Sequence, residues 1–147
     1  MESPKADYLK YWRVIRYYFK HKYGLTQVEL DMLLFLYSEQ YFSRDKFNEY
    51  DEICGWDKER FNKLLRNGWI EVFRKQSGRN RAIYQLSYKT KRMIISLYKK
   101  LNGEEIPVTL QNNKMFKKNV SYTDKVYRNL IKEMNMAIQR PRHRPRE

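Results

Sequence analysis

The sequence predicts a mostly α-helical chain with a small two- or three-stranded antiparallel sheet, and three observations lead to this expectation. Apolar residues recur at helical spacing in six segments between residues 8 and 138. Residues 70–73 and 83–86 instead alternate as half-buried strands do. The two segments flank a basic loop, RKQSGRNRA, whose Gly78 favours a tight turn.

Length and charge favour one domain that binds a polyanion. The 147 residues, 41% of them hydrophobic, suffice for one core, which we expect over residues 1–139. The net charge of +14 favours polyanions, nucleic acid first among them. No apolar stretch approaches the roughly 20 residues that span a bilayer, and the N-terminus lacks the apolar middle of a secretion signal. We therefore expect a cytoplasmic protein with no membrane partner.

The inventory of reactive side chains argues against catalysis. Cys54 is the only cysteine, and His21 and His143 are the only histidines. An intramolecular disulfide and a cysteine-based zinc site are therefore excluded, and a hydrolytic triad is hard to assemble. We expect no enzymatic activity, no metal and no cofactor, and we expect Cys54 to be a small buried hydrophobe rather than a redox sensor.

Residues 8–23 form the first expected helix. Apolar and aromatic side chains cover about two thirds of its circumference, more than one packing face needs. The helix is either buried by its own domain or also in contact with a second subunit. The next helix starts at Thr26, which has the capping-box spacing to Glu29, and its nearly all-apolar stretch after Met32 predicts the centre of the core.

Two further helices are expected before the strands. Ser43 can cap the first of them, whose apolar side runs through Phe47 to Ile53. Helical periodicity restarts near Asp57, a second N-cap candidate, and continues over residues 57–67 with a basic outer face. Gly68 suits the left-handed position that ends a helix.

The C-terminal half has simpler signals. Ser87 or Thr90 can cap a helix that runs to about residue 101, and a last helix is expected over residues 121–138. Residues 104–120 between them predict a long connection with little order of its own. The tail, residues 140–147, alternates arginine with proline and histidine and predicts a disordered basic arm.

This order of elements resembles the winged helix-turn-helix regulators of the MarR family over roughly residues 8–138. Three stretches carry the resemblance: LTQVEL at 25–30 is similar to the family's helix start, LLRNGWI at 64–70 to the end of its recognition helix, and LSYK at 86–89 to the close of its wing. The family's wing usually holds an Asp-x-Arg pair, whereas SGRNR at 77–81 contains no acidic residue. The resemblance implies a homodimer that binds double-stranded DNA and regulates transcription in a bacterial or phage-infected cell.

Two groups of side chains are the expected DNA contacts. A helix in the major groove would present its outer face to base edges and phosphates, and a wing would place its arginines in a minor groove. The alternative is a solvated basic face and a solvated turn. The recognition-helix candidates are Lys58, Arg60, Asn62, Lys63 and Arg66. The wing candidates are Arg74, Lys75, Arg79, Asn80 and Arg81.

The ends of the chain supply the remaining expectations. Helices 8–23 and 121–138, with the connection from residue 104, would form the base of the dimer, and residues 25–101 the winged helix-turn-helix core. The tail either clamps phosphates without sequence preference or aids solubility. The dimer candidates are Tyr8, Tyr11, Trp12, Ile15, Val126, Leu130 and Met134, and the tail candidates are Arg140, Arg142, Arg144 and Arg146.

A second function class stays open. The same basic, aromatic-rich chain could be a structural component of a phage particle or nucleoprotein assembly, located in the virion, that reuses the fold to pack against other proteins. A small-molecule effector pocket between dimer helices and DNA-binding lobe is also open, but no residue argues for one. A discrete dimer in solution favours the regulator, and a ring or polymer favours the assembly.

Overall fold

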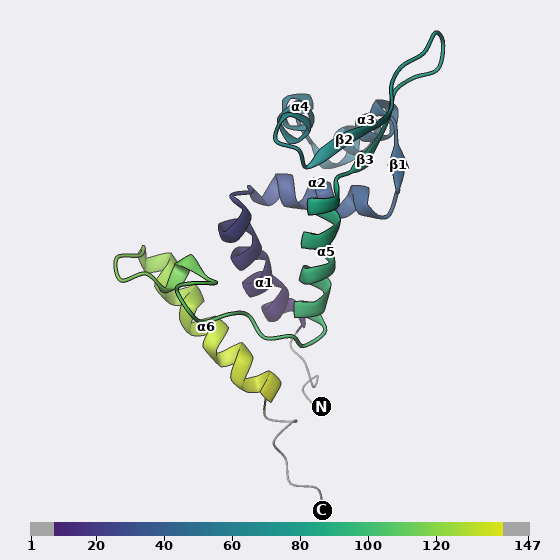
Figure 1. Cartoon of the computed structure of the whole chain (residues 1–147). Helices are drawn as coiled ribbons and strands as arrows, with labels where there is room; N and C mark the ends of the chain where they lie inside the picture. The colour runs from purple at the N-terminus through teal and green to yellow at the C-terminus, as the bar shows by residue number, and fades with distance from the viewer. Residues whose placement is uncertain (1–7, 140–147) are drawn as a thin grey trace, which may run out of the picture. The chain divides into compact units, whose positions relative to one another are not determined.

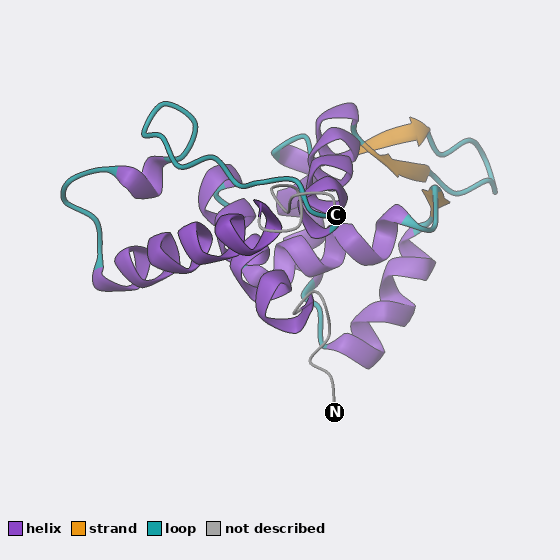
Figure 2. Cartoon of the chain, turned by 90° about the horizontal axis from the view of Figure 1, so that it is seen from below, coloured by secondary structure: helices purple, strands orange, loops and turns teal. Residues whose placement is uncertain are grey.

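The computed structural model describes residues 8–139. The chain forms two compact units: unit 1 contains the residues up to Leu25 and those from Ser96 onward, and unit 2 contains Thr26–Ile95. Figures 1 and 2 show the six helices and the small sheet. The single domain over residues 1–139 stays a prediction, and the basic tail lies outside the described residues.

Unit 2 is built from three helices, a three-stranded sheet and the start of a fourth helix. Its antiparallel sheet has the order β1-β3-β2. The predicted fold class, mostly α with a small antiparallel wing after a helix-turn-helix, is confirmed. The elements in chain order are α2 Gln27–Tyr37, β1 Tyr41–Phe42, α3 Arg44–Cys54, α4 Lys58–Arg66, β2 Ile70–Arg74, β3 Ile83–Leu86 and α5 Tyr88–Leu101, which continues into unit 1.

Local capping signals place the helix ends of unit 2. The capping box at Thr26 is confirmed, because its Oγ1 accepts from the Glu29 N–H at 3.2 Å and the Glu29 carboxylate accepts from the Thr26 N–H at 3.2 Å. Ser43 occupies the N-cap of α3 in extended backbone but makes no side-chain cap bond. The sequence therefore predicted the N-cap position of Ser43 correctly, but not a capping hydrogen bond from its side chain.

The core of unit 2 lies where α2, α3 and α4 meet. Leu33 and Leu36 of α2 are fully buried, and Phe47 of α3 lies 4.9 Å from Phe61 of α4 between ring centroids. Trp56, in the turn between α3 and α4, is also buried and lies 5.7 Å from the Phe47 ring. Aromatic packing therefore fixes the angle of the helix-turn-helix.

Two expectations about α3 are wrong. Ile53 is 83% exposed instead of continuing the apolar side of the helix, and the Cys54 thiol is exposed rather than buried. The reason is Trp56, whose large ring fills the space beside Phe47 and Tyr50 that the last turn of α3 would otherwise cover. Gly55, with φ of +68°, turns the chain so that this ring points inward.

The expected alternation of the first strand is also wrong. Only Ile70 of β2 is buried, and the next four residues are exposed. β2 lies at the edge of the sheet, and a bulge between Val72 and Arg74 breaks its register with β3. β3, the central strand, does alternate, with Tyr84 and Leu86 buried. β2 thus leaves the core after Ile70, whereas β3 stays in contact with the core through Tyr84 and Leu86.

Unit 1 is organised around the contact between α1, Tyr8–Tyr23, and α6, Tyr122–Gln139. The rings of Tyr17 and Tyr127 stack with centroids 3.8 Å apart. The Tyr17 hydroxyl donates to the Asp124 carboxylate, whose other oxygen lies 3.3 Å from His21 Nε2. Burial, together with the bond to Asp124, raises the pKa of the Tyr17 hydroxyl. Val14 and Ile15 of α1 are buried within the chain.

Residues 104–120 have more order than the sequence predicts. The buried Asn135 side chain of α6 bonds to both backbone groups of Ile106, at 3.0 Å from its N–H and 2.8 Å from its carbonyl. Asn113 caps the short 3₁₀ helix η1, Lys114–Phe116, which carries the fully buried Met115. The side-chain amides of Asn135 and Asn113 order this segment through hydrogen bonds to its backbone. The sequence did not predict this order because such bonds produce no periodic pattern of residues. No helix within residues 8–139 is long and apolar enough to span a bilayer.

Candidate nucleic-acid interface

α4 is a short helix whose two ends are fixed by the sequence. The Asp57 carboxylate accepts from the Glu59 N–H at 2.9 Å, as expected of an N-cap. At the other end Gly68 has φ of +78°, and its N–H donates to the Leu65 carbonyl at 3.2 Å. The Trp69 N–H donates to the Leu64 carbonyl at 2.9 Å, which completes a Schellman motif. The predicted termination at Gly68 is confirmed.

One lysine of α5 holds the end of α4 in place. Lys89 Nζ donates to the Asn67 carbonyl at 2.7 Å and lies 4.2 Å from the centroid of the Trp69 ring. A cation at this position also interacts favourably with the negative end of the helix dipole. The sequence marked Lys89 only as part of the motif after the wing. Its contact with the end of α4 joins residues 22 positions apart, so no local sequence pattern predicts it.

The outer face of α4 carries most of the predicted recognition residues. Phe61 and Leu64 are buried on the inner face, whereas Arg60 is half-buried on the flank. Glu59 shares the outer face and is its single acidic member, as the sequence indicated. The exposed residues of α4 are Lys58, Glu59, Asn62, Lys63 and Arg66.

Lys63 is exposed, but its ammonium group forms an ion pair within unit 2. Its Nζ lies 3.5 Å from the Glu29 carboxylate, whose side chain is only 3% exposed, while that of Lys63 is 51% exposed. Glu29 also belongs to the capping box of α2. Lys63 therefore neutralises a buried carboxylate and connects α4 to α2. Within residues 8–139, Lys58, Arg60 and Arg66 make no ion pair.

The wing is an exposed hairpin that ends in a tight turn. Ser77 and Asn80 exchange backbone hydrogen bonds of 3.0 and 2.9 Å around Gly78 and Arg79. Gly78 has φ of +56° and Arg79 does not have a positive φ, as in type II′ hairpin turns. All wing candidates are exposed, and Arg74, Lys75 and Arg79 make no ion pair within the described part of the chain.

Two neighbouring residues at the start of α3 join the recognition face to the wing. Arg44 Nη2 donates to the Asn62 side chain at 2.6 Å, and its guanidinium lies 4.8 Å from the Phe61 ring centroid. Asp45, the next residue, forms an ion pair with Arg81, which directly follows the Ser77–Asn80 turn of the wing. The outer face of α4 and the wing therefore flank the same helix start. In Figure 1, α4 and the hairpin both lie above α2.

The Asp45–Arg81 pair supplies the acidic partner that the wing loop lacks. The sequence shows no carboxylate near Arg81, but α3 provides one from 36 residues away. The sequence did not predict a role for Arg44, because nothing in the local sequence around this arginine indicates that it contacts α4. Both contacts depend on the tertiary fold, so residue spacing does not show them.

The other predicted residues lie on unit 1 or outside the described structure. Tyr11, Trp12 and Leu130 are half-buried, and Val126 is 39% exposed, while Ile15 and Met134 are buried within the chain. A hollow of 270 Å³ lies between α1 and α6, lined by Val14, Val126, Tyr127 and Leu130 with Lys10 and Arg13 at its edge. Tyr8 begins α1. The four tail arginines fall on undescribed residues.

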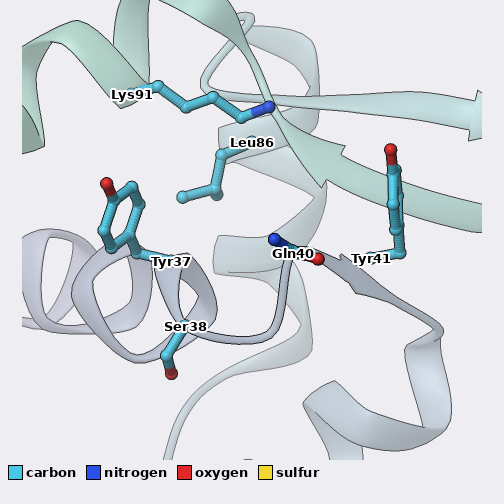
Figure 3. Close-up of a pocket in the computed structure, with 6 residues that line it drawn as sticks. All are labelled: Tyr37, Ser38, Gln40, Tyr41, Leu86 and Lys91. Atoms are coloured by element: carbon cyan, nitrogen blue, oxygen red, sulfur yellow. The ribbon is translucent and has the colours of Figure 1, made fainter.

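A further hollow of unit 2 has a volume of 470 Å³ and lies beside the sheet (Figure 3). Gln40, with φ of +60°, lies between α2 and β1 and lines the hollow. Lys91 is the only charged residue that lines it, and Ser38 points away from the other side chains in Figure 3. The residues that line it are Tyr37, Ser38, Gln40, Tyr41, Leu86 and Lys91. In the described residues no group of three histidine, cysteine or acidic side chains could hold a metal.

Comparison with known proteins gave one similar structure. No protein-family model and no curated protein matches the chain. Among solved structures, the chain is similar to a cysteine-to-serine mutant of MarR from E. coli complexed with operator DNA. The identity is 13%, the match covers 85% of each chain, and the TM-score is 0.46.

Proposed function

We propose that unit 2 binds double-stranded DNA, with α4 in the major groove and the wing against an adjacent minor groove. The observation that carries the proposal is the shared helix start: Arg44 holds Asn62 of α4 while Asp45 holds Arg81 of the wing. These pairs keep two sets of exposed cations on either side of one element. An α-helix about 10–12 Å across fits a major groove about 12 Å wide.

Each set of side chains suits its groove. Arg66 can donate two parallel hydrogen bonds to a guanine, and Glu59 can accept from a cytosine amino group. Asn62, whose Oδ1 accepts from Arg44, can donate from its Nδ2 to adenine N7. Arg79 sits at the apex of a turn with no ion pair within residues 8–139, so its guanidinium is available for the negative potential of an A·T-rich minor groove. Lys58 and Lys75 would contact phosphates.

The proposed role is that of a transcriptional regulator acting by occupancy, as a homodimer that reads two half-sites. Half-sites about 34 Å apart would match one helical turn of DNA. The partly exposed side chains of α1 and α6, namely Tyr11, Trp12, Val126 and Leu130, would supply the dimer contact. Ile15 and Met134 would support it from within the chain.

The test is a selection of bound duplexes from a random-sequence pool, carried out with the wild type and two variants. The K58A/R66A variant removes two cations from α4, and K91A/R92A removes two exposed cations from α5 of the same unit. We expect the wild type and the α5 variant to enrich one palindromic sequence, and the α4 variant to enrich none. The same enriched sequence from all three proteins would contradict the assignment of α4.

A further inference from the structure

A second concentration of cations lies in unit 1, away from α4 and the wing in the sequence. Between residues 114 and 132 the chain carries six lysines or arginines and a single carboxylate, Asp124. Five of the six cations are exposed and Arg128 is half-buried. We call this group the α6 surface: Lys114, Lys117, Lys118, Lys125, Arg128 and Lys132.

The fold gathers these cations from two segments into one surface. Lys125, Arg128 and Lys132 follow at i, i+3 and i+7 on α6, so they form one stripe of the helix. The segment of η1 packs on α6 beside them, as Figures 1 and 2 both show. Arg128 Nη1 donates to the Lys117 carbonyl at 3.2 Å, which ties the loop lysines to the stripe.

Two cations of the α6 surface, Arg128 and Lys132, lie over the ring of Phe116. Its ring centroid lies 5.8 Å from the Arg128 guanidinium and 5.7 Å from Lys132 Nζ. Phe116 is half-buried and its neighbour Met115 is fully buried. Cations therefore cover the apolar groups at this place, and no large apolar side chain of η1 projects from the surface.

The carboxylates of α6 do not neutralise the stripe. Asp124 is engaged by Tyr17 and His21, and Glu133 lies 3.8 Å from Lys10. All three partners belong to α1, so both carboxylates are used in the α1–α6 contact. None of the six cations of the α6 surface forms an ion pair with another described residue. Their charge is available to a partner.

We propose that the α6 surface binds the phosphate backbone of double-stranded nucleic acid without sequence preference. Five of its six cations are lysines, which act as point charges toward phosphate rather than as two-pronged readers of base edges. A lipid bilayer is less well suited at η1, because its apolar side chains, Met115 and Phe116, are buried or covered by cations. This inference does not depend on α4 or the wing, and it adds a second contact surface to the proposed function.

The test measures the salt dependence of binding to a random-sequence duplex, with the full chain, by fluorescence anisotropy. The K117E/K118E variant reverses two charges of the α6 surface, and K22E/K99E reverses two exposed lysines of unit 1 outside it. Each lost phosphate contact lowers the slope of log K against log salt by about 0.9. We expect the first variant to lose about two units of slope and to bind roughly tenfold more weakly at 0.15 M salt. The second variant should keep the wild-type slope.

Two further measurements separate this inference from the proposed function. The R66A/R79A variant disables α4 and the wing, and we expect it to retain random-duplex binding that K117E/K118E then removes. If K117E/K118E changes neither background, or changes both no more than K22E/K99E does, the inference is wrong whatever α4 does. If K117E/K118E releases the chain only from vesicles of phosphatidylserine and not from DNA, the surface serves a membrane and the nucleic-acid assignment is overturned.

Discussion

Lys63 illustrates how one side chain can serve both the fold and a ligand surface. It sits on the outer face of α4, yet its ammonium lies 3.5 Å from the buried Glu29 carboxylate. A buried carboxylate without a cation is costly, so the pair stabilises the junction of α2 and α4. Arg66, one turn further along α4, makes no such contact in the described residues. The two basic residues therefore differ in what their removal does.

We predict that Lys63→Ala lowers the free energy of unfolding by roughly 1 kcal/mol, a value reduced from that of a fully buried pair because Lys63 is half exposed. Arg66→Ala should leave stability within about 0.5 kcal/mol of the wild type. Urea unfolding of both variants followed by circular dichroism measures the difference. Equal stability of the two variants would show that the Glu29 contact contributes nothing.

Some single-residue roles could be predicted from sequence patterns alone. Thr26, Asp57 and Gly68 act on backbone groups within a few residues of themselves, so their capping roles were legible in the sequence. Arg44 and Asp45 act on partners 18 and 36 residues away. No spacing rule reports such contacts, and the connection between α4 and the wing became visible only in the folded chain.

The wing carries one paired and one unpaired arginine near its turn. Arg81, directly after the turn, is paired with Asp45 of α3, whereas Arg79 occupies the apex of the Ser77–Asn80 turn and makes no ion pair within residues 8–139. The edge strand β2 is exposed beyond Ile70, and a bulge between Val72 and Arg74 shifts its register with β3. The alternation in the sequence predicted two strands correctly but misplaced this exposure, because alternation does not report where a strand leaves the core.

We predict that Arg79→Ala weakens DNA binding more on A·T-rich flanks than on G·C-rich flanks, by a factor of about five. The reason is that a narrow A·T minor groove concentrates negative potential at the position of the tip. Gel-shift titrations on a matched pair of duplexes provide the measurement, with Lys91→Ala as a variant of equal charge change. Identical losses on both flanks would mean that the tip touches only phosphates.

At the scale of the whole molecule, the two units divide the proposed work. Unit 2 carries α4 and the wing, and unit 1 carries the aromatic α1–α6 contact together with the α6 surface. The sequence indicated the basic helix and hairpin of unit 2 well. The sequence does not predict the α6 surface, because three of its cations lie in a segment without helical periodicity and three lie on the outer stripe of a helix. Only the fold brings the two segments together.

We predict that the full chain is a discrete dimer, with twice the 18.3 kDa mass of one chain in light scattering. Val126→Asp places a charge beside the apolar hollow between α1 and α6 and should shift the mass to that of one chain. Val108→Asp, at a similarly exposed valine of the connection, should not. A wild-type monomer would contradict the dimer, and a ring or concentration-dependent polymer would favour an assembly role.

If the proposal is right, α4 and the wing face one duplex together. A titration of the ¹⁵N-labelled chain with the duplex obtained from the selection, followed through the backbone amide resonances, measures whether they do. We expect the amides of residues 58–66 and 77–81 to shift in parallel and to saturate at the same ratio of DNA to protein. Shifts confined to one of these two groups, or absent from both while DNA is bound, would contradict the account.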